Sequence, residues 1–200
     1  MDRTVQNYRS SRTAGNAVDC SGQSVVAVVV NRLYRATTNP YWTHRSGAMK
    51  EIERLSTIED LRRLMARYVY NADQQRWQDL ASLFTTDGAF TPRNVDGSVA
   101  RRMEGRAEIS ESIPASIGPG AVVVHHLFSY EIDVESATAA RGVWAMEDLI
   151  ERPASTGPDG KPRFISMHGF GHYRPRFTKV DGAWKIAELV LTRVRMDLAY

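Results

Sequence analysis

The sequence predicts an α+β fold, with helices first and long antiparallel strands after them. From residue 50 to about residue 113, apolar side chains recur at the spacing of amphipathic helices. From residue 122 to residue 196, they alternate at the two-residue spacing of strands. Helices in one run and strands in the next are typical of layered α+β domains, so we place one domain at residues 50–200.

Residues 1–49 are expected to form a basic, largely disordered N-terminal extension. Residues 1–48 carry six arginines and two aspartates, a net charge of +4. Residues 49–200 carry 20 lysines and arginines and 21 aspartates and glutamates, which gives −1. The extension has weak periodicity, with at most one short element at Val25–Tyr34. Because the domain itself is close to neutral, we expect no nucleic-acid partner.

The sequence also predicts no membrane span, no metal and no cofactor. Its longest apolar run, Val25–Val30, is far too short to cross a bilayer, and no signal-peptide cleavage pattern follows it. The single cysteine, Cys20, forms neither an internal disulfide nor a thiolate metal site. Compact metal-ligand spacings and phosphate-binding loops are missing as well. We therefore expect a cytoplasmic protein.

Three helices are predicted before the long strands. The first opens at a capping box, Ser56–Glu59, and its apolar stripe continues to Ala72. The second is short, with the apolar stripe Trp77, Leu80, Leu83 and Phe84. A turn signal at Asp87-Gly88 then leads into a short strand, Ala89–Pro92, and a third helix is expected at Gly105–Ile113.

Four long strands follow the Gly118-Pro119-Gly120 break. Alternation predicts them at Val122–Val134, Thr138–Glu151, Phe164–Val180 and Trp184–Met196. Asp181-Gly182 is a hairpin turn signal between the last two. The polar loop Pro153–Pro162 joins the middle pair.

Tyr68 and Asp73 are the first polar groups at positions where a packed core should be apolar. The simple interpretations are an ordinary core tyrosine and an N-cap of the following helix. The functional interpretation is a pocket in which Asp73 orients and charges a histidine. The two residues lie about 140° apart around a helix, so they share a pocket only if it is wide or the helix ends near Asp73.

His125 and His126 open a long strand, and alternation sends one to each face. Parity groups His126 with Phe128, Tyr130 and Ile132, and His125 with Leu127, Ser129 and Glu131. Parity alone thus makes His125 the more polar-facing residue, unless a bulge near the strand start reverses it.

Asp148 follows Trp144 and Met146 at period two and therefore lies on an apolar strand face, whereas Glu147 lies on the other. A buried carboxylate needs a partner. We expect that partner to be Arg193, which shares a face with apolar residues of the last strand. A purely structural ion pair and a functional one both stay open.

Taken in order, these residues resemble the SnoaL-like branch of the nuclear transport factor 2-like superfamily, from about Ile58 to Met196. The motifs are Tyr68-x4-Asp73-x3-Trp77-x2-Leu80-x2-Leu83-Phe84-x2-Asp87-Gly88, Gly105-Arg106-Ala107, His125-x3-Ser129 and Asp181-Gly182-Ala183-Trp184-Lys185-Ile186. The resemblance implies a curved antiparallel sheet wrapped around the N-terminal helices to form a cone-shaped pocket. It specifies fold better than activity, because the superfamily includes dehydratases, isomerases, cyclases, epoxide hydrolases and proteins without catalysis.

Within this family the chain is most similar to bile-acid 7α-dehydratase and, more distantly, to scytalone dehydratase. The segment Trp144–Asp148 carries the likeness, and a gapless alignment there places His125 on the catalytic histidine. The resemblance implies five catalytic residues: Asp73, His125, Tyr68, Asp148 and Arg193. We also expect substrate contacts from Trp144, Tyr173 and Phe90. Pro175 and the loop Pro153–Pro162 depart from the relatives' pattern.

The resemblance implies a cofactor-free dehydratase that acts on a hydrophobic, hydroxylated carbonyl compound of steroid or polyketide type. His125, held by Asp73, would be the general base, and Tyr68 would bind the substrate carbonyl. Asp148 and Arg193 would bind or protonate the leaving hydroxyl. The alternatives are a non-catalytic binding protein, an isomerase or cyclase of the same fold, and a dioxygenase small subunit. We expect a homo-oligomer, dimer or trimer, packed through the outer face of the sheet.

Overall fold

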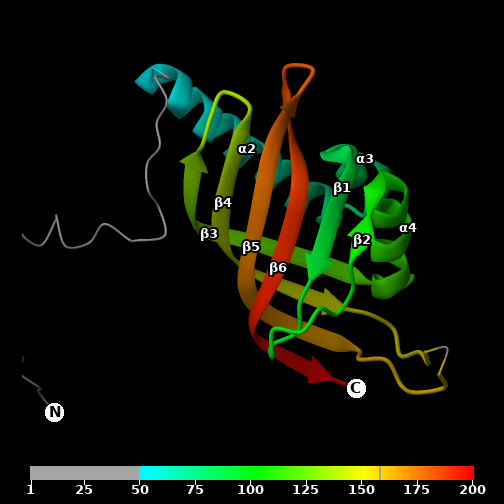
Figure 1. Ribbon diagram of the computed structural model, residues 1–200. Coiled ribbons are helices and arrows are strands. Elements are labelled where there is room, and N and C mark those ends of the chain that lie inside the picture. The colour runs from blue at the N-terminus through cyan, green and yellow to red at the C-terminus, as the bar shows by residue number, and fades with distance from the viewer. Residues whose placement is uncertain (1–49, 158) are drawn as a thin grey trace, which may run out of the picture. The chain divides into compact units, whose positions relative to one another are not determined.

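The computed structural model describes residues 50–157 and 159–200. The predictions for residues 1–49, including the element at Val25–Tyr34, lie outside the described residues. The elements, in chain order, are α2 (Glu51–Asp73), α3 (Trp77–Ser82), β1 (Phe84–Pro92), β2 (Met103–Glu104), α4 (Gly105–Ile117), β3 (Val122–Val134), β4 (Ala139–Glu151), β5 (Ser166–Val180) and β6 (Ala183–Ala199) (Figure 1). The predicted α+β class is confirmed, and no helix among the described residues could span a membrane.

The six strands form one open sheet in the order β2-β1-β6-β5-β4-β3. Strands β3 to β6 pair antiparallel as predicted, but β1 runs parallel to β6. The prediction of a wholly antiparallel sheet is therefore wrong at this pair. The two strands are separated in the chain by β2, α4 and the three strands β3 to β5, and a connection of that length permits a parallel pairing that a hairpin forbids.

Helix α2 begins at Glu51, several residues before the predicted start. The backbone amide of Lys50 donates to Glu53 Oε2, and Arg54 pairs with Glu51 at 2.7 Å, so this extra turn has its own local support. Ser56–Glu59 lies inside the helix, and the predicted capping box is wrong. The helix ends at Asp73, which is the condition for Tyr68 and Asp73 to serve one site.

The other boundaries differ from the predictions where a long-range contact extends or shortens an element. Helix α3 ends at Ser82, and Phe84 already belongs to β1. The Asp87-Gly88 pair lies inside β1, where the register shifts against β6, rather than in a turn before it. A Cβ on Gly88 would come within 2.9 Å of the carbonyl oxygen of Ile186, which explains the glycine. Helix α4 continues beyond Ile113 to Ile117.

A bulge in β3 decides which histidine faces inward. The register against β4 shifts between Leu127 and Tyr130. Before the shift, His125 pairs with Asp148, and after it Tyr130 pairs with Trp144, so His125 and Tyr130 share one face although their numbers differ in parity. The predicted grouping of Tyr130 with His126 is therefore wrong. His125 belongs to the inner, largely apolar face of the sheet.

The core lies between this inner face and the three helices. Helix α2 packs on β3, α4 packs on β1, and α3 packs on α4, while β3 to β6 curve along their length (Figure 1). Leu61, Met65, Ile109, Ile186 and Leu189 are fully buried at the centre. This arrangement leaves a hollow toward one end of the curved sheet, and that hollow holds the candidate site.

Candidate active site

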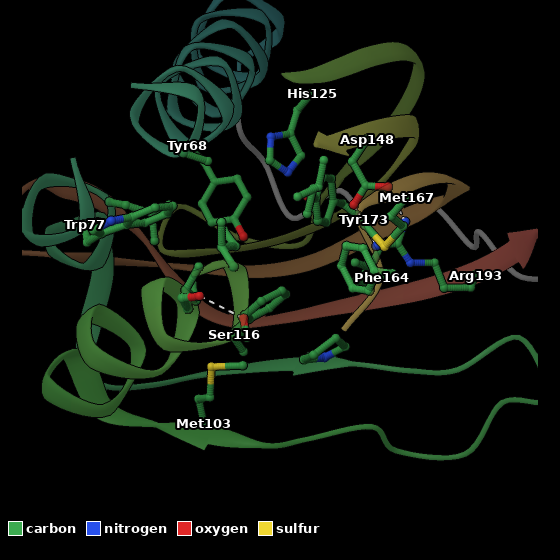
Figure 2. A pocket seen from close by; sticks show the side chains of 18 residues that line it. Tyr68, Trp77, Met103, Ser116, His125, Asp148, Phe164, Met167, Tyr173 and Arg193 are labelled. Atoms are coloured by element: carbon green, nitrogen blue, oxygen red, sulfur yellow. Dashed lines mark hydrogen bonds and ion pairs between the residues drawn. The ribbon is translucent and has the colours of Figure 1, made fainter. Parts of the chain in front are cut away.

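A cavity of about 230 Å³ lies between the helices and the inner face of the sheet (Figure 2). Most of its wall is apolar, with Trp77, Phe90, Met103, Ile113, Phe164 and Met167 among the lining residues. The polar side chains in the wall are Tyr68, Ser116, His125, Asp148, Tyr173 and Arg193. An apolar chamber with a few convergent polar groups is the usual form of a small-molecule site.

Asp73 and His125 form a hydrogen-bonded pair at this wall. The carboxylate oxygen Oδ1 of Asp73 lies 2.7 Å from His125 Nδ1 and accepts the His125 backbone amide at 3.0 Å. The histidine side chain is 9% exposed and the aspartate 26%. Because Asp73 holds Nδ1, the other ring nitrogen, Nε2, is the one available to a molecule in the cavity.

The same geometry rejects the simple interpretation of Asp73. Helix α3 begins after Arg76, and no side chain caps it. Asp73 is the last residue of α2, and its carboxylate instead bonds His125 near the start of β3, 52 positions further along the chain. The N-cap interpretation is therefore wrong.

Asp148 and Arg193 form a buried, two-pronged ion pair. Nη1 and Nη2 of Arg193 donate to Oδ1 and Oδ2 of Asp148 at 2.5 and 2.6 Å, and the two side chains are 8% and 4% exposed. Burial lowers the pKa of Arg193, but the hydrogen bond to Asp148 and its charge outweigh burial and raise that pKa overall. The pair is a fixed, net neutral group with remaining guanidinium N–H donors.

Gly169 makes this ion pair possible. Arg193 extends from β6, Asp148 stands on β4, and β5 lies between them, so the guanidinium must cross β5. Gly169 pairs with Asp148 in the β4–β5 register, and a Cβ there would collide with both Asp148 Oδ1 and Arg193 Nη1. The missing side chain is the gap through which the arginine reaches the acid.

Tyr68 and Tyr173 complete the polar part of the wall. Both side chains are buried, and their rings meet edge to face with centroids 5.5 Å apart. Burial raises the pKa of each phenol above its ordinary value. Both hydroxyls are therefore neutral hydrogen-bond donors at physiological pH.

Among the predicted catalytic residues, Tyr68, His125, Asp148 and Arg193 line the cavity, and Asp73 reaches it through His125. The predicted contact residues Phe90 and Tyr173 also line it. Trp144 does not, because its ring stacks on Tyr130 at 5.9 Å and meets the Phe177 ring edge to face at 6.0 Å. Alternation identified Trp144 as inward-facing but could not separate core from cavity.

Several residues of the wall were not among the predicted site residues, including the apolar Trp77, Met103, Phe164 and Met167 and the polar Ser116. The helical stripe predicted that Trp77 points inward, which was the only available signal. Ser116 lies in the last turn of α4, beyond the predicted end of that helix. Phe164 is the first residue of the predicted strand Phe164–Val180, but β5 begins two residues later, at Ser166.

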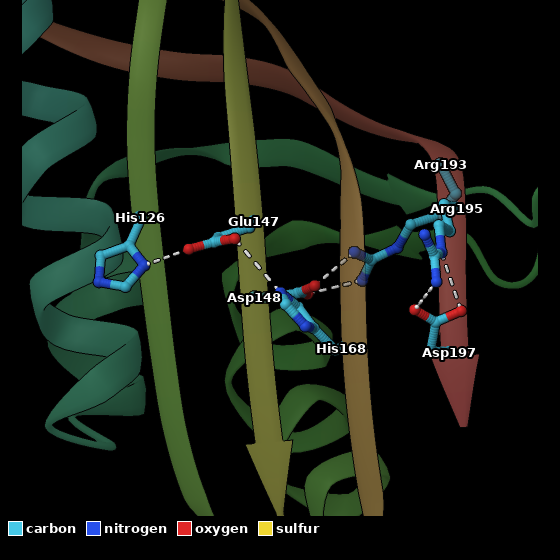
Figure 3. A network of polar contacts seen from close by, with 7 residues as sticks. All are labelled: His126, Glu147, Asp148, His168, Arg193, Arg195 and Asp197. Carbon is cyan, nitrogen blue, oxygen red and sulfur yellow. Dashed lines mark hydrogen bonds and ion pairs between the residues drawn. The ribbon is translucent and has the colours of Figure 1, made fainter. Parts of the chain in front are cut away.

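A second polar cluster lies on the outer face of the sheet (Figure 3). Glu147 contacts His126 Nδ1 at 2.8 Å through Oε1 and His168 Nε2 at 3.2 Å through Oε2. These hydrogen bonds, the one from His126 first, lower the pKa of Glu147. The two histidine side chains are 54% and 39% exposed, and the described residues contain no cluster of three or more His, Cys, Asp or Glu side chains arranged to bind a metal ion.

Solved structures share this fold at low sequence identity. A hexachlorocyclohexane dehydrochlorinase, LinA type 2, superposes with a TM-score of 0.62 at 15% identity, over 76% of this chain and 94% of that one. A protein described as a putative scytalone dehydratase from Novosphingobium aromaticivorans gives 0.61 at 20% identity, over 76% and 93%. Rv3472 of Mycobacterium tuberculosis, described as of unknown function, gives 0.56 at 26% identity, over 74% and 79%.

These structural similarities establish a shared fold. The predicted similarity to bile-acid 7α-dehydratase stays a prediction. The family profile described as a SnoaL-like domain matches residues 53–190, which is most of the chain. Its match begins in the first turn of α2 and ends within β6, so it includes every predicted site residue except Arg193. The chain therefore belongs to the SnoaL-like family.

Proposed function

We propose that this protein is a cofactor-free acid–base enzyme that eliminates water from a small, uncharged, hydroxylated carbonyl compound of steroid or polyketide type. The observation that carries the proposal is the Asp73–His125 pair, which presents one imidazole nitrogen to an apolar cavity. The other polar groups, Tyr68 and the Asp148–Arg193 pair, line the same cavity. Together they supply a base, a carbonyl-binding donor and a site for the leaving group.

In the proposed reaction, His125 Nε2 removes the proton on the carbon next to the substrate carbonyl. The Asp73 carboxylate stabilises the imidazolium that forms, and the Tyr68 hydroxyl donates to the carbonyl oxygen as it gains negative charge. The carbon–oxygen bond to the leaving hydroxyl then breaks, and a guanidinium N–H of Arg193 holds that oxygen. His125 returns the proton to it, so that water leaves and the neutral imidazole is restored.

The charges in the wall support an uncharged substrate. The two ionised side chains in the wall, Arg193 and Asp148, are already paired with each other, and His125 is hydrogen-bonded to Asp73. A substrate carboxylate or phosphate inside the cavity would therefore be desolvated without an unpaired cation in that wall, which is costly. A ring compound with one carbonyl and one hydroxyl can satisfy the polar groups and bury its carbons against Trp77, Phe90 and Met103.

The test measures elimination from neutral β-hydroxyketones of one to three rings by the absorbance of the enone product. Asp73→Asn and His125→Ala are expected to lower kcat by about 10²–10⁴-fold, the usual contribution of acid–base assistance. His126→Ala, on the outer face, is the matched control and should retain full activity. Circular dichroism checks that all three variants fold. Full turnover in folded Asp73→Asn and His125→Ala would contradict the proposal.

The expected homo-oligomer also remains a proposal. Val124 and Phe128 lie on the outer face of β3 and are 37% and 56% exposed, which supports burial against a second copy. Sedimentation velocity would measure the mass of the assembly, and a mass of one chain would contradict it.

A further inference from the structure

Arg152, the residue that follows β4, ties two walls of the cavity together. Its guanidinium donates to three backbone carbonyl oxygens: Phe164 at 2.6 Å, Ser116 at 3.0 Å and Ile117 at 3.2 Å. Its Cζ also stands 3.6 Å from the centroid of the Phe164 ring. One side chain thus connects the last turn of α4 to the segment between β4 and β5.

The end of α4 explains why an arginine is needed there. The last carbonyl groups of a helix have no partners within the helix, and the negative end of its dipole favours a cation. The last turn of α4 contains no basic residue, and Gly118, with φ of 89°, ends the helix. Arg152 supplies both the donors and the charge from outside the helix.

The Arg152 guanidinium is held by carbonyl groups and an aromatic ring. Burial and the nearby charge of Arg163 lower the pKa of Arg152. The hydrogen-bond partners of its guanidinium in the described part of the chain are carbonyl oxygens, not carboxylates. The geometry of three acceptors and one ring suits a planar guanidinium, and the single ammonium of a lysine cannot reproduce it.

The residues that Arg152 holds are themselves part of the site. Ser116, Ile117 and Phe164 all line the cavity, and Figure 2 shows Ser116 and Phe164 at its wall. We propose that Arg152 is a positioning residue that sets the size of ring compound the cavity admits, by fixing the distance between the end of α4 and Phe164. The inference rests on the proposed function, since it assumes that this cavity holds the substrate.

The proposal separates size selection from chemistry. The Asp73–His125 pair comes from α2 and β3, whereas the hydrogen bonds of the Arg152 guanidinium within the described residues go to α4 and to Phe164. Replacing Arg152 should therefore change which compounds bind, and KM, while kcat for a small substrate changes little. If Arg152 merely stabilised the fold, its replacement would lower the melting temperature and the kcat for every substrate alike.

Binding can be measured without turnover by using three neutral ketones as probes: cyclohexanone, 1-tetralone and anthrone. Titration calorimetry gives the Kd of each for the wild type, Arg152→Lys and Arg152→Gln. In both variants anthrone should bind more tightly relative to 1-tetralone. The ratio of the 1-tetralone Kd to the anthrone Kd should therefore rise by at least roughly fivefold, because pocket contacts discriminate by such factors. Arg163→Gln, which removes a neighbouring charge on the same segment, should leave the ratio unchanged.

A second variant tests the wall without touching Arg152. Ile117→Ala enlarges the same wall and should move the ratio in the same direction, so the test survives if an Arg152 variant fails to fold. Unchanged ratios in folded Arg152→Lys, or in Ile117→Ala, would overturn the inference alone. If the wild type binds none of the three ketones, the proposed function fails as well, and the two failures are thereby distinguished.

Discussion

Two histidine–carboxylate pairs lie on opposite faces of the same sheet and differ mainly in their surroundings. Nδ1 of His125 is 2.7 Å from Asp73, and Nδ1 of His126 is 2.8 Å from Glu147. The His125 side chain is 9% exposed beside an apolar cavity, whereas that of His126 is 54% exposed to solvent. Hydrogen-bond geometry is thus nearly equal, and burial is what distinguishes a candidate catalytic pair from a surface contact.

Substitutions of Asp148 and Glu147, which are adjacent in the chain, test most directly whether the two faces of the sheet differ. Asp148→Asn should lower the free energy of unfolding by roughly 3–5 kcal/mol, because it leaves the buried Arg193 cation without its counter-charge. Glu147→Gln, at a solvated cluster, should cost much less. Urea denaturation followed by circular dichroism measures both.

The double variant Asp148→Asn/Arg193→Met serves as the control for that prediction. Removing both charges should restore much of the lost stability, since a buried pair is often replaceable by neutral residues of similar volume. Equal losses in Asp148→Asn and Glu147→Gln would show that the two faces do not differ as described.

Gly169→Ala should have the next largest effect. The new Cβ would collide with Asp148 and Arg193, and overpacking of this kind costs about 1–3 kcal/mol. Because the collision falls on the ion pair, proposed elimination activity should fall as well. Thermal unfolding and the enone assay measure the two effects.

Gly97→Ala is the control for Gly169→Ala. Gly97 has φ of 85°, so an alanine is strained there, but its Cβ would meet nothing within 4 Å. It should lower the melting temperature slightly and leave activity intact. Loss of activity in Gly97→Ala equal to that in Gly169→Ala would remove the argument for a gap in β5.

The smallest expected effect concerns pH. Burial raises the pKa of Tyr68, so above its ordinary value of about 10 the unfolded chain loses a proton that the folded chain keeps. The unfolded state then binds fewer protons, and stability falls as pH rises. Tyr68→Phe should reduce this alkaline loss by about 1 kcal/mol at pH 11. Tyr70→Phe, at an exposed position on the same helix, should not, and urea midpoints at pH 9 and pH 11 decide between them.

Features that depend on neighbouring residues were predictable from the sequence. Periodicity placed β3 at Val122–Val134, which are its observed bounds, and placed the later strands within one to three residues. The Asp181-Gly182 turn was predicted as well, and both residues adopt positive φ, 51° and 79°, as a tight hairpin requires. Alternation likewise put Asp148 on the buried face.

The site itself depended on contacts between distant segments. Parity failed in β3 because a single bulge inverts the phase after Leu127, and a bulge leaves no reliable mark in one sequence. The identity of Asp73's partner was decided by where α2 ends against β3. Trp144 and Tyr173 are both inward-facing and buried, yet only Tyr173 reaches the cavity.

The sequence by itself therefore determined the class of fold, the order of its elements and the polar residues that a core would not normally contain. Each of these follows from local spacing, which periodicity and turn chemistry express directly. The tertiary structure alone decided the parallel β1–β6 pairing, the inward face of His125 and the passage of Arg193 over Gly169. The reason is that these features depend on register and packing between strands that the chain brings together only on folding.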